Sequence, residues 1–270
     1  MRGHLIPVSN FSGVAPGQRP TLDVPPSGTY KKFDILCSRG AIPMTQAQVI
    51  SDIEEIVIKV EGKVQRRYTP AALVALNALY GKTFEDGHLP IYLAEPHREG
   101  AAQVEAYAWG MADISICQIE VKLADAAVDP RLAMEAIWSP ARANMGTIKK
   151  VKTFNLPVTA TGANTWPAPK VDPYAAIHLL NTDINKVKIL RDNTEVVNVS
   201  PASIHSRLDD NGLTPQAGWT HVVFDATGDL PDALPMRTST GDPVGDFRVE
   251  LDMSAVGGVD ILTETIGARD

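Results

Sequence analysis

The stretches "YTPAAL" (residues 68–73) and "VSPASI" (residues 199–204) lie 131 positions apart and follow one pattern. After a first residue that differs, both read hydroxyl residue, proline, alanine, small residue, aliphatic residue. Residues 53–93 can be laid over residues 184–224 without a gap. Seven positions are identical, where about three are expected from average composition: Ile53/Ile184, Ile58/Ile189, Pro70/Pro201, Ala71/Ala202, Gly81/Gly212, Thr83/Thr214 and Gly87/Gly218. The chain therefore carries an internal repeat.

The repeated stretch predicts the start of a helix. The hydroxyls of Thr69 and Ser200 can accept hydrogen bonds from the free amides of a first helical turn. The proline that follows each of them suits the first helical position, where its missing N–H costs nothing. Gly81 and Gly212 then predict the ends of the two helices, because a left-handed residue is favoured there.

A pair of short strands precedes each predicted helix. Apolar residues alternate with other residues over 56–60 and 187–189, which is the period of a strand. Two-residue turn candidates follow, Glu61-Gly62 and Asp192-Asn193, and Gly and Asn tolerate the positive φ that tight hairpins need. The next stretches, "KVQRRY" and "TEVVNV", predict the second strands. Each copy thus reads strand, tight turn, strand, capped helix and glycine stop.

The similarity continues over most of the chain. Further strands are predicted in matching pairs: "LPIYL" and "THVVF", "CQIEVKL" and "FRVELDM", "LAMEAIW" and "ILTETI", and "YKKFDIL" and "YAAIHLL". The pair "CQIEVKL" and "FRVELDM" needs one deletion, and the last pair is offset by 144 positions instead of 131. The difference, 144 − 131 = 13, places an insertion in the first half of the chain, around Arg39–Ser51.

These patterns predict an all-β protein of two tandem eight-stranded antiparallel jelly rolls, with short helices in the loops. We predict an N-terminal arm at residues 1–19, a first roll at 20–146 and a second roll at 147–270. Twenty glycines, twenty prolines and few aromatic residues in 270 residues agree with turn-rich β structure.

The charge of the chain argues against nucleic-acid binding. Its net charge is −7, whereas phosphate binding needs a positive face. The compact basic clusters are Lys149-Lys150-Val151-Lys152 and Arg66-Arg67, which we interpret as solvated strand faces. Cys37 and Cys117 stand in apolar strand-like runs and are expected to be buried free thiols. The chain shows no secretory leader and no run of about 20 apolar residues, so we expect synthesis in a reducing cytoplasm.

The sequence contains no convincing motif for an enzyme. A double jelly roll could be a cupin oxygenase, but this class needs clustered histidines, and no two of the six lie within two residues of one another: His4, His88, His97, His178, His205 and His221. Glu95 with Glu99, or Glu120 with Glu250, could supply the acid pair of a glycosidase. However, Glu120 and Glu250 are equivalent in the repeat and read as outer-face strand residues. We therefore assign no catalytic or cofactor-binding residue.

Metal binding stays open. The stretch 207–218 fails as a calcium loop, because Arg207 and Gly218 stand where carboxylates are required. Other loops are rich in carboxylates, namely Asp225, Asp229, Asp232, Asp242 and Asp246. A calcium ion in "DATGDLPD" or between subunits is consistent with them, but no ligand can be named. The stretch 238–246 lacks the Lys-Ser/Thr pair of a P-loop.

The pattern "IxxIxIxVEGK…TPAALxxLN…G" followed by "LPIYLAEP" resembles the major capsid proteins of small tailless icosahedral bacteriophages, nearest to the corticovirus type, which have an internal membrane. The resemblance spans the whole chain. It implies a double jelly roll that trimerises into pseudo-hexagonal tiles of a virion shell. It also implies structural divalent ions, and an N-terminal segment with Arg2 and His4 that faces the membrane or bridges neighbouring tiles.

We therefore predict a major capsid protein that is not an enzyme, is made in the host cytoplasm and is located in the virion. Its expected partners are further copies of itself, neighbouring trimers, penton or minor capsid proteins and internal membrane proteins, with no direct contact to nucleic acid. Two alternatives remain: a carbohydrate-binding or carbohydrate-cleaving tandem β-sandwich, secreted or cytoplasmic, and a minor coat or spike protein.

Overall fold

The computed structural model describes residues 3–141, 143–228 and 232–270. The chain divides into two compact units: unit 1 is Met1–Lys152 with Gly267–Asp270, and unit 2 is Thr153–Ile266. Residues 4–7, inside the segment predicted as an arm, form a strand. The predicted limits at residues 19 and 146 stay a prediction.

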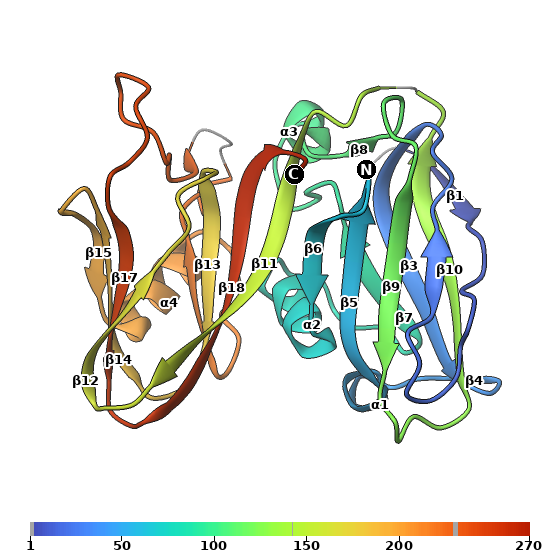
Figure 1. Cartoon of the computed structure of the whole chain (residues 1–270), viewed down its shortest axis with the longest axis horizontal. Coiled ribbons are helices and arrows are strands. Elements are labelled where there is room, and N and C mark those ends of the chain that lie inside the picture. Colours follow the sequence, from blue (N-terminus) through green and yellow to red (C-terminus); the bar gives the residue numbers. More distant parts are fainter. Residues whose placement is uncertain (1–2, 142, 229–231) are drawn as a thin grey trace. The chain divides into compact units, whose positions relative to one another are not determined.

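Unit 1 is a jelly roll built from two sheets (Figure 1). One sheet has the order β1-β10-β3, with β7, β8 and the short β4 also paired to β3; the other has the order β2-β9-β5-β6. Helix α1 lies at one end of the unit and α3 at the other. The strands are β1 (His4–Pro7), β2 (Thr21–Asp23), β3 (Thr29–Arg39), β4 (Ile42–Pro43), β5 (Ile53–Val60), β6 (Lys63–Tyr68), β7 (His88–Tyr92), β8 (Trp109–Gly110), β9 (Cys117–Leu123) and β10 (Pro130–Ser139), and the helices are α1 (Gln46–Asp52), α2 (Pro70–Leu79) and α3 (Ala101–Glu105).

Unit 2 has the same plan. Its sheets have the orders β11-β18-β13-β16 and β12-β17-β14-β15. Its elements are β11 (Thr147–Val158), β12 (Gly162–Pro167), β13 (Tyr174–Leu180), β14 (Ile184–Arg191), β15 (Thr194–Val199), α4 (Pro201–Asp210), β16 (Trp219–Val223), β17 (Phe247–Met253) and β18 (Gly257–Ala268). Strand β11 begins in unit 1 and continues into unit 2. The strands of unit 2 take the same places as β1, β2, β3, β5, β6, β7, β9 and β10 do in unit 1, so the predicted double jelly roll is confirmed.

The local signals of the repeat act as predicted. Thr69 accepts a hydrogen bond from the amide of Ala72 at 3.2 Å, and Ser200 accepts one from the amide of Ser203 at 3.4 Å. In each hairpin, both turn residues have positive φ: 49° and 77° at Glu61-Gly62, and 49° and 63° at Asp192-Asn193. These residues fix the strand pairing, because a turn of this type sets the register of a hairpin.

The insertion in the first half forms α1 together with the short strand β4. Thr45 starts this helix with a capping box, in which its side chain and that of Gln48 bond each other's backbone amides. The helix ends at Asp52, whose buried carboxylate takes two hydrogen bonds from Arg39, at 2.8 and 2.6 Å. The insertion is therefore tied to β3 by its own ion pair.

The core of each unit lies between its two sheets and is filled by alternate strand residues. Phe33 and Ile35 of β3 are fully buried in unit 1, as are Val187 and Ile189 of β14 in unit 2. The two cysteines are buried free thiols, as predicted. Burial raises the pKa of both Cys37 and Cys117 to about 12, so both thiols are protonated and unreactive at neutral pH.

Candidate functional site

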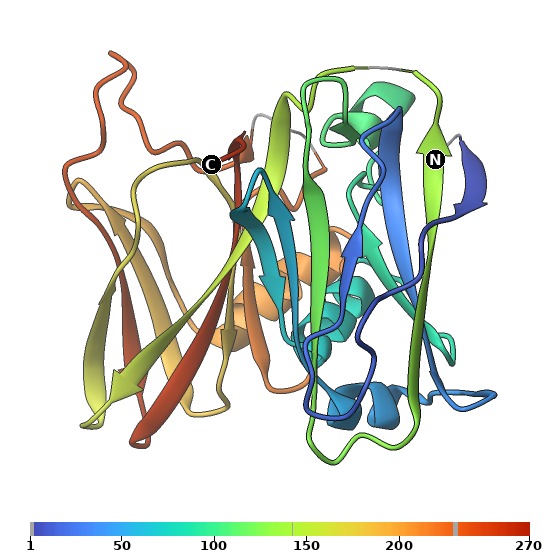
Figure 2. The ribbon, with the colours of Figure 1, turned by 45° about the vertical axis from the view of Figure 1, so that its right-hand side comes forward.

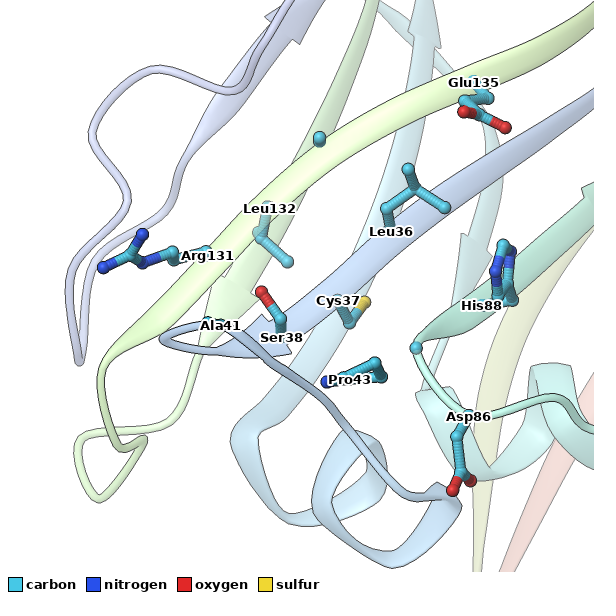
Figure 3. A pocket seen from close by; sticks show the side chains of 12 residues that line it. Leu36, Cys37, Ser38, Ala41, Pro43, Asp86, His88, Arg131, Leu132 and Glu135 are labelled. Atoms are coloured by element: carbon cyan, nitrogen blue, oxygen red, sulfur yellow. The ribbon is translucent and has the colours of Figure 1, made fainter.

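A groove of about 510 Å³ lies on the outer face of unit 1, where β3 and β10 run side by side (Figure 3). Leu36 of β3 stands opposite Ala133 of β10 on its floor. The segment of Ala41 and Pro43 borders it on one side and His88, at the start of β7, on another. Its floor is apolar and its rim is charged.

The carboxylate of Asp34 on this face has two polar partners. Asp34 of β3 accepts a hydrogen bond from Lys32 at 2.8 Å, and the Nδ1 atom of His88 lies 3.3 Å from the same carboxylate oxygen. Glu135 stands opposite Asp34 on β10, and Pro7 of β1 stands opposite Glu135. With its thiol protonated, Cys37 offers no nucleophile here. Its apolar floor and charged rim suit contact with another surface.

A buried ion cluster joins the first residues of β11 to the rest of unit 1. The carboxylate of Glu95 lies between the ammonium group of Lys149 and the guanidinium group of Arg98, and all three side chains are buried. Burial by itself raises the pKa of Glu95, but the charges of Lys149 and Arg98 outweigh this effect and hold the pKa at about 2. Glu95 is therefore ionised at neutral pH.

Arg66 fixes the backbone beside this cluster. It donates hydrogen bonds to the carbonyl of Lys149 at 2.9 Å and to the carbonyl of Tyr92 at 2.7 Å. Its guanidinium carbon lies 5.4 Å from the ring centre of Trp109, within the range of a cation–π contact.

The interpretation of the basic clusters as solvated strand faces was wrong at Arg66, Lys149 and Lys150, which are buried. Their partners explain the error, because they lie far away in the sequence. The carboxylate of Asp270 accepts a hydrogen bond from Lys150 and another from Lys152, both at 2.8 Å. No local pattern reveals such pairs.

Unit 2 contains a pair of buried histidines. His178 of β13 stands opposite His221 of β16, and their Nδ1 atoms are 2.9 Å apart. Both side chains are fully buried. Burial first, and then the nearby His178 and His205, lower the pKa of His221 to about 2, so the ring is neutral at ordinary pH. The separation of the two histidines in sequence concealed this pair, and only the pairing of β13 with β16 could have revealed it.

Three of the four acid candidates are held in ion pairs. Glu120 contacts Lys59 at 2.5 Å and Arg19 at 3.7 Å, while Glu250 contacts Arg248 at 3.1 Å and Lys188 at 3.6 Å. Both alternate with core residues along their strands and are held in ion pairs. Glu99 is exposed, whereas Glu95 is buried in its cluster.

The loop aspartates have local partners. Asp232 accepts a hydrogen bond from Thr227, Asp242 accepts one from Thr240 at 2.8 Å, and Asp246 pairs with Arg248 at 3.1 Å. Asp225 is buried, and Asp229 and Arg2 lie outside the described residues. Within residues 3–141, 143–228 and 232–270, no three His, Cys, Asp or Glu side chains come together as metal ligands.

None of the described helices is both long and apolar enough to cross a membrane.

Comparison with known proteins gives two family matches. Residues 5–139 match the model of the viral coat protein P2 N-terminal domain, and residues 148–269 match that of the viral coat protein P2 C-terminal domain. A search of curated protein sequences gives no match.

Solved structures share the fold. The major capsid protein P2 from Bacteriophage PM2 is 19% identical, with a TM-score of 0.89 over 100% of this chain and 98% of its own. The STIV major capsid protein is 11% identical, with a TM-score of 0.69 over 98% and 97%. The Faustovirus major capsid protein is 7% identical, with a TM-score of 0.62 over 98% and 89%.

Proposed function

The chain belongs to the viral coat protein P2 family, and we propose that it is the major capsid protein of a tailless, membrane-containing bacteriophage and assembles as a homotrimer. The strongest support for this proposal is the agreement between the family models and the internal repeat. The two models match residues 5–139 and 148–269, which are the two halves of the repeat. Each covers one complete jelly roll. Three copies of a double roll present six similar units around an axis, which suits a tile with near-hexagonal outline.

The proposed partners follow from this role. They are neighbouring trimers in the shell, penton or minor capsid proteins and proteins of the internal membrane. The protein is made in the host cytoplasm and resides in the virion. Contact with the genome is not part of the proposal, because the net charge of −7 opposes phosphate binding.

The proposed role is structural and involves no catalysis. The buried carboxylate of Glu95 is neutralised by two cations, and the thiols of Cys37 and Cys117 are protonated. These groups stabilise a scaffold, and none of them has the pKa near neutrality that acid–base catalysis needs.

The mass of the protein in solution tests the proposal. Size-exclusion chromatography with light scattering is expected to give three times the chain mass of 29.1 kDa, or larger sheets and shells. The experiment is run with and without calcium, because we propose that any calcium site is shared between copies. A species with the mass of a single chain under both conditions contradicts the trimer.

A further inference from the structure

One sheet in each unit ends in a strongly exposed strand. In unit 2, β15 is the last strand of the order β12-β17-β14-β15, and five of its six residues are exposed. In unit 1, β1 is the first strand of its sheet, and three of its four residues are exposed (Figure 2). Leu5 of β1 is 67% exposed and Val196 of β15 is 38% exposed. Such edges present unpaired N–H and C=O groups to which a further strand can bind.

The strand that corresponds to β15 in unit 1 is covered. This strand is β6. It follows a two-residue turn and pairs with β5, and β15 likewise follows a two-residue turn and pairs with β14. On its other side, β6 pairs in parallel with the start of β11, where Val151 stands opposite Arg66. Half of β6 is buried, whereas β15 has no second partner strand in the described part of the chain.

The segment that covers β6 has a counterpart in the chain. Strand β11 is the first of the order β11-β18-β13-β16, and β1 has the same place in the order β1-β10-β3 with β7. Among the described residues, no strand pairs with the side of β1 that faces away from β10. The chain therefore has two exposed strands with complementary counterparts. Strand β15 corresponds to β6, which is covered, and strand β1 corresponds to β11, which covers it.

We propose that β1 of one copy binds in parallel to β15 of a second copy, as the start of β11 pairs with β6. This inference rests on the proposed self-assembly and names the surfaces that make it. Backbone hydrogen bonds provide the contact, and the exposed apolar side chains of Leu5, Val196 and Val199 are buried by it. The contact joins two different edges, β1 of one copy and β15 of the next, and is therefore head to tail. Each copy that is added leaves one β1 edge and one β15 edge free at the ends of the assembly. Such a contact closes into a ring of three when each step turns by a third of a circle.

Edge-blocking variants test the contact. Leu5→Lys and Val196→Lys each place a charge on one of the two edges. Lysine on an edge strand opposes the addition of a further strand, and neither change removes a buried side chain. Val256→Lys is the matched control, because Val256 is 62% exposed but lies in the turn before β18. Light scattering is expected to show loss of the trimer for each edge variant and a trimer for the control.

Cross-linking tests the same contact directly. Leu5→Cys is combined in one chain with Val196→Cys, Val197→Cys or Val199→Cys, and each protein is oxidised. Neighbouring strands lie within disulfide range, and the native cysteines are buried. At least one pair is expected to give chains linked in twos and threes, whereas Leu5→Cys with Val256→Cys gives none.

The outcomes separate the two proposals. If the wild type is a trimer but the edge variants stay trimeric and no pair cross-links, the β1–β15 contact is wrong and the capsid role stands. A cross-link that closes only within one chain also overturns the contact. A wild type that stays at 29.1 kDa contradicts both.

Discussion

The two rolls share one backbone plan but differ in the side chains at equivalent positions. On β3 of unit 1, Asp34 stands opposite Pro90, while on β13 of unit 2, His178 stands opposite His221. The two offsets of the internal repeat relate these pairs position by position. The same strand position thus carries a buried carboxylate, which contacts Lys32 and His88, in one unit and one ring of a buried histidine pair in the other. The difference shows that turn and cap residues fix the backbone, whereas the surroundings of each roll decide which side chains it tolerates.

A second difference lies in the buried charges. Glu95 of unit 1, with its two cationic partners, corresponds in the repeat to Ala226 of unit 2, which is also buried. Arg66 likewise corresponds to Val197. Unit 1 therefore depends on a set of ion pairs at positions where unit 2 uses small or apolar residues.

Removing one member of this ion cluster is expected to have the largest effect on stability. Glu95→Ala leaves Lys149 and Arg98 buried without their carboxylate, and removal of one partner from a buried pair costs about 3–5 kcal/mol. Urea-induced unfolding, followed by circular dichroism, measures the loss.

The matched control for this change is Glu250→Ala in unit 2, because Glu250 pairs with Lys188 and Arg248 at a partly exposed position. Exposed pairs contribute about 0–1 kcal/mol. Equal losses in the two variants would show that unit 1 does not depend on its buried charges.

The helices α2 and α4 provide the next comparison. Leu79 of α2 is fully buried, and the corresponding residue of α4 is the exposed Asp210. Leu79→Ala is expected to cost about 2–5 kcal/mol through the cavity it leaves, while Asp210→Ala changes the free energy of unfolding by less than about 0.5 kcal/mol. Urea unfolding of both variants measures the difference, and a small effect at Leu79 would mean that the core collapses onto the helix.

The parts of this fold that could be predicted from sequence are those encoded by neighbouring residues. The caps at Thr69 and Ser200 and the turns at Glu61-Gly62 and Asp192-Asn193 act within a few residues, so their types and spacing reveal them. The repeat then supplied the domain plan, and the insertion at residues 39–51 followed from a change of offset.

The parts that could not be predicted depend on residues far apart in the chain. Lys149 is buried because Glu95 reaches it, and Lys150 because Asp270 does. His178 and His221 meet through strand pairing across 43 residues. Whether a charged side chain is buried depends on its surroundings in the folded chain. From sequence alone, a run of basic residues is therefore interpreted as a solvated face, because charged residues are most often exposed.

The buried histidines are expected to make unit 2 sensitive to mild acid. The pKa of His221 falls from its ordinary 6.5 to about 2 in the folded protein, so the unfolded chain takes up a proton first as the pH is lowered. The stability is complete above pH 6.5 and is lost progressively as the pH falls toward 2. At pH 5 the loss is about 2 kcal/mol, from about 1.36 kcal/mol for each pH unit.

The window between pH 6.5 and 5 separates this effect from that of the carboxyl groups, because the lowered carboxyl pKa values, such as that of Glu95, act below pH 4.5. His221→Phe is expected to flatten the dependence of unfolding free energy on pH in this window, whatever its stability at pH 7. An unchanged slope in His221→Phe would assign the acid sensitivity to another group.

The smallest expected effect concerns the helix caps. Thr69→Ala and Ser200→Ala each remove one hydroxyl that accepts from a first-turn amide, which costs about 1 kcal/mol. Helix α2 buries six of its ten residues and α4 buries two, yet the cap is a local bond and its loss is expected to be similar in both. Thr69→Ser and Ser200→Thr keep the bond and serve as controls in thermal and urea unfolding. A cost at Thr69 several times that at Ser200 would show that packing around the helix, rather than the hydroxyl itself, sets the strength of the repeated motif.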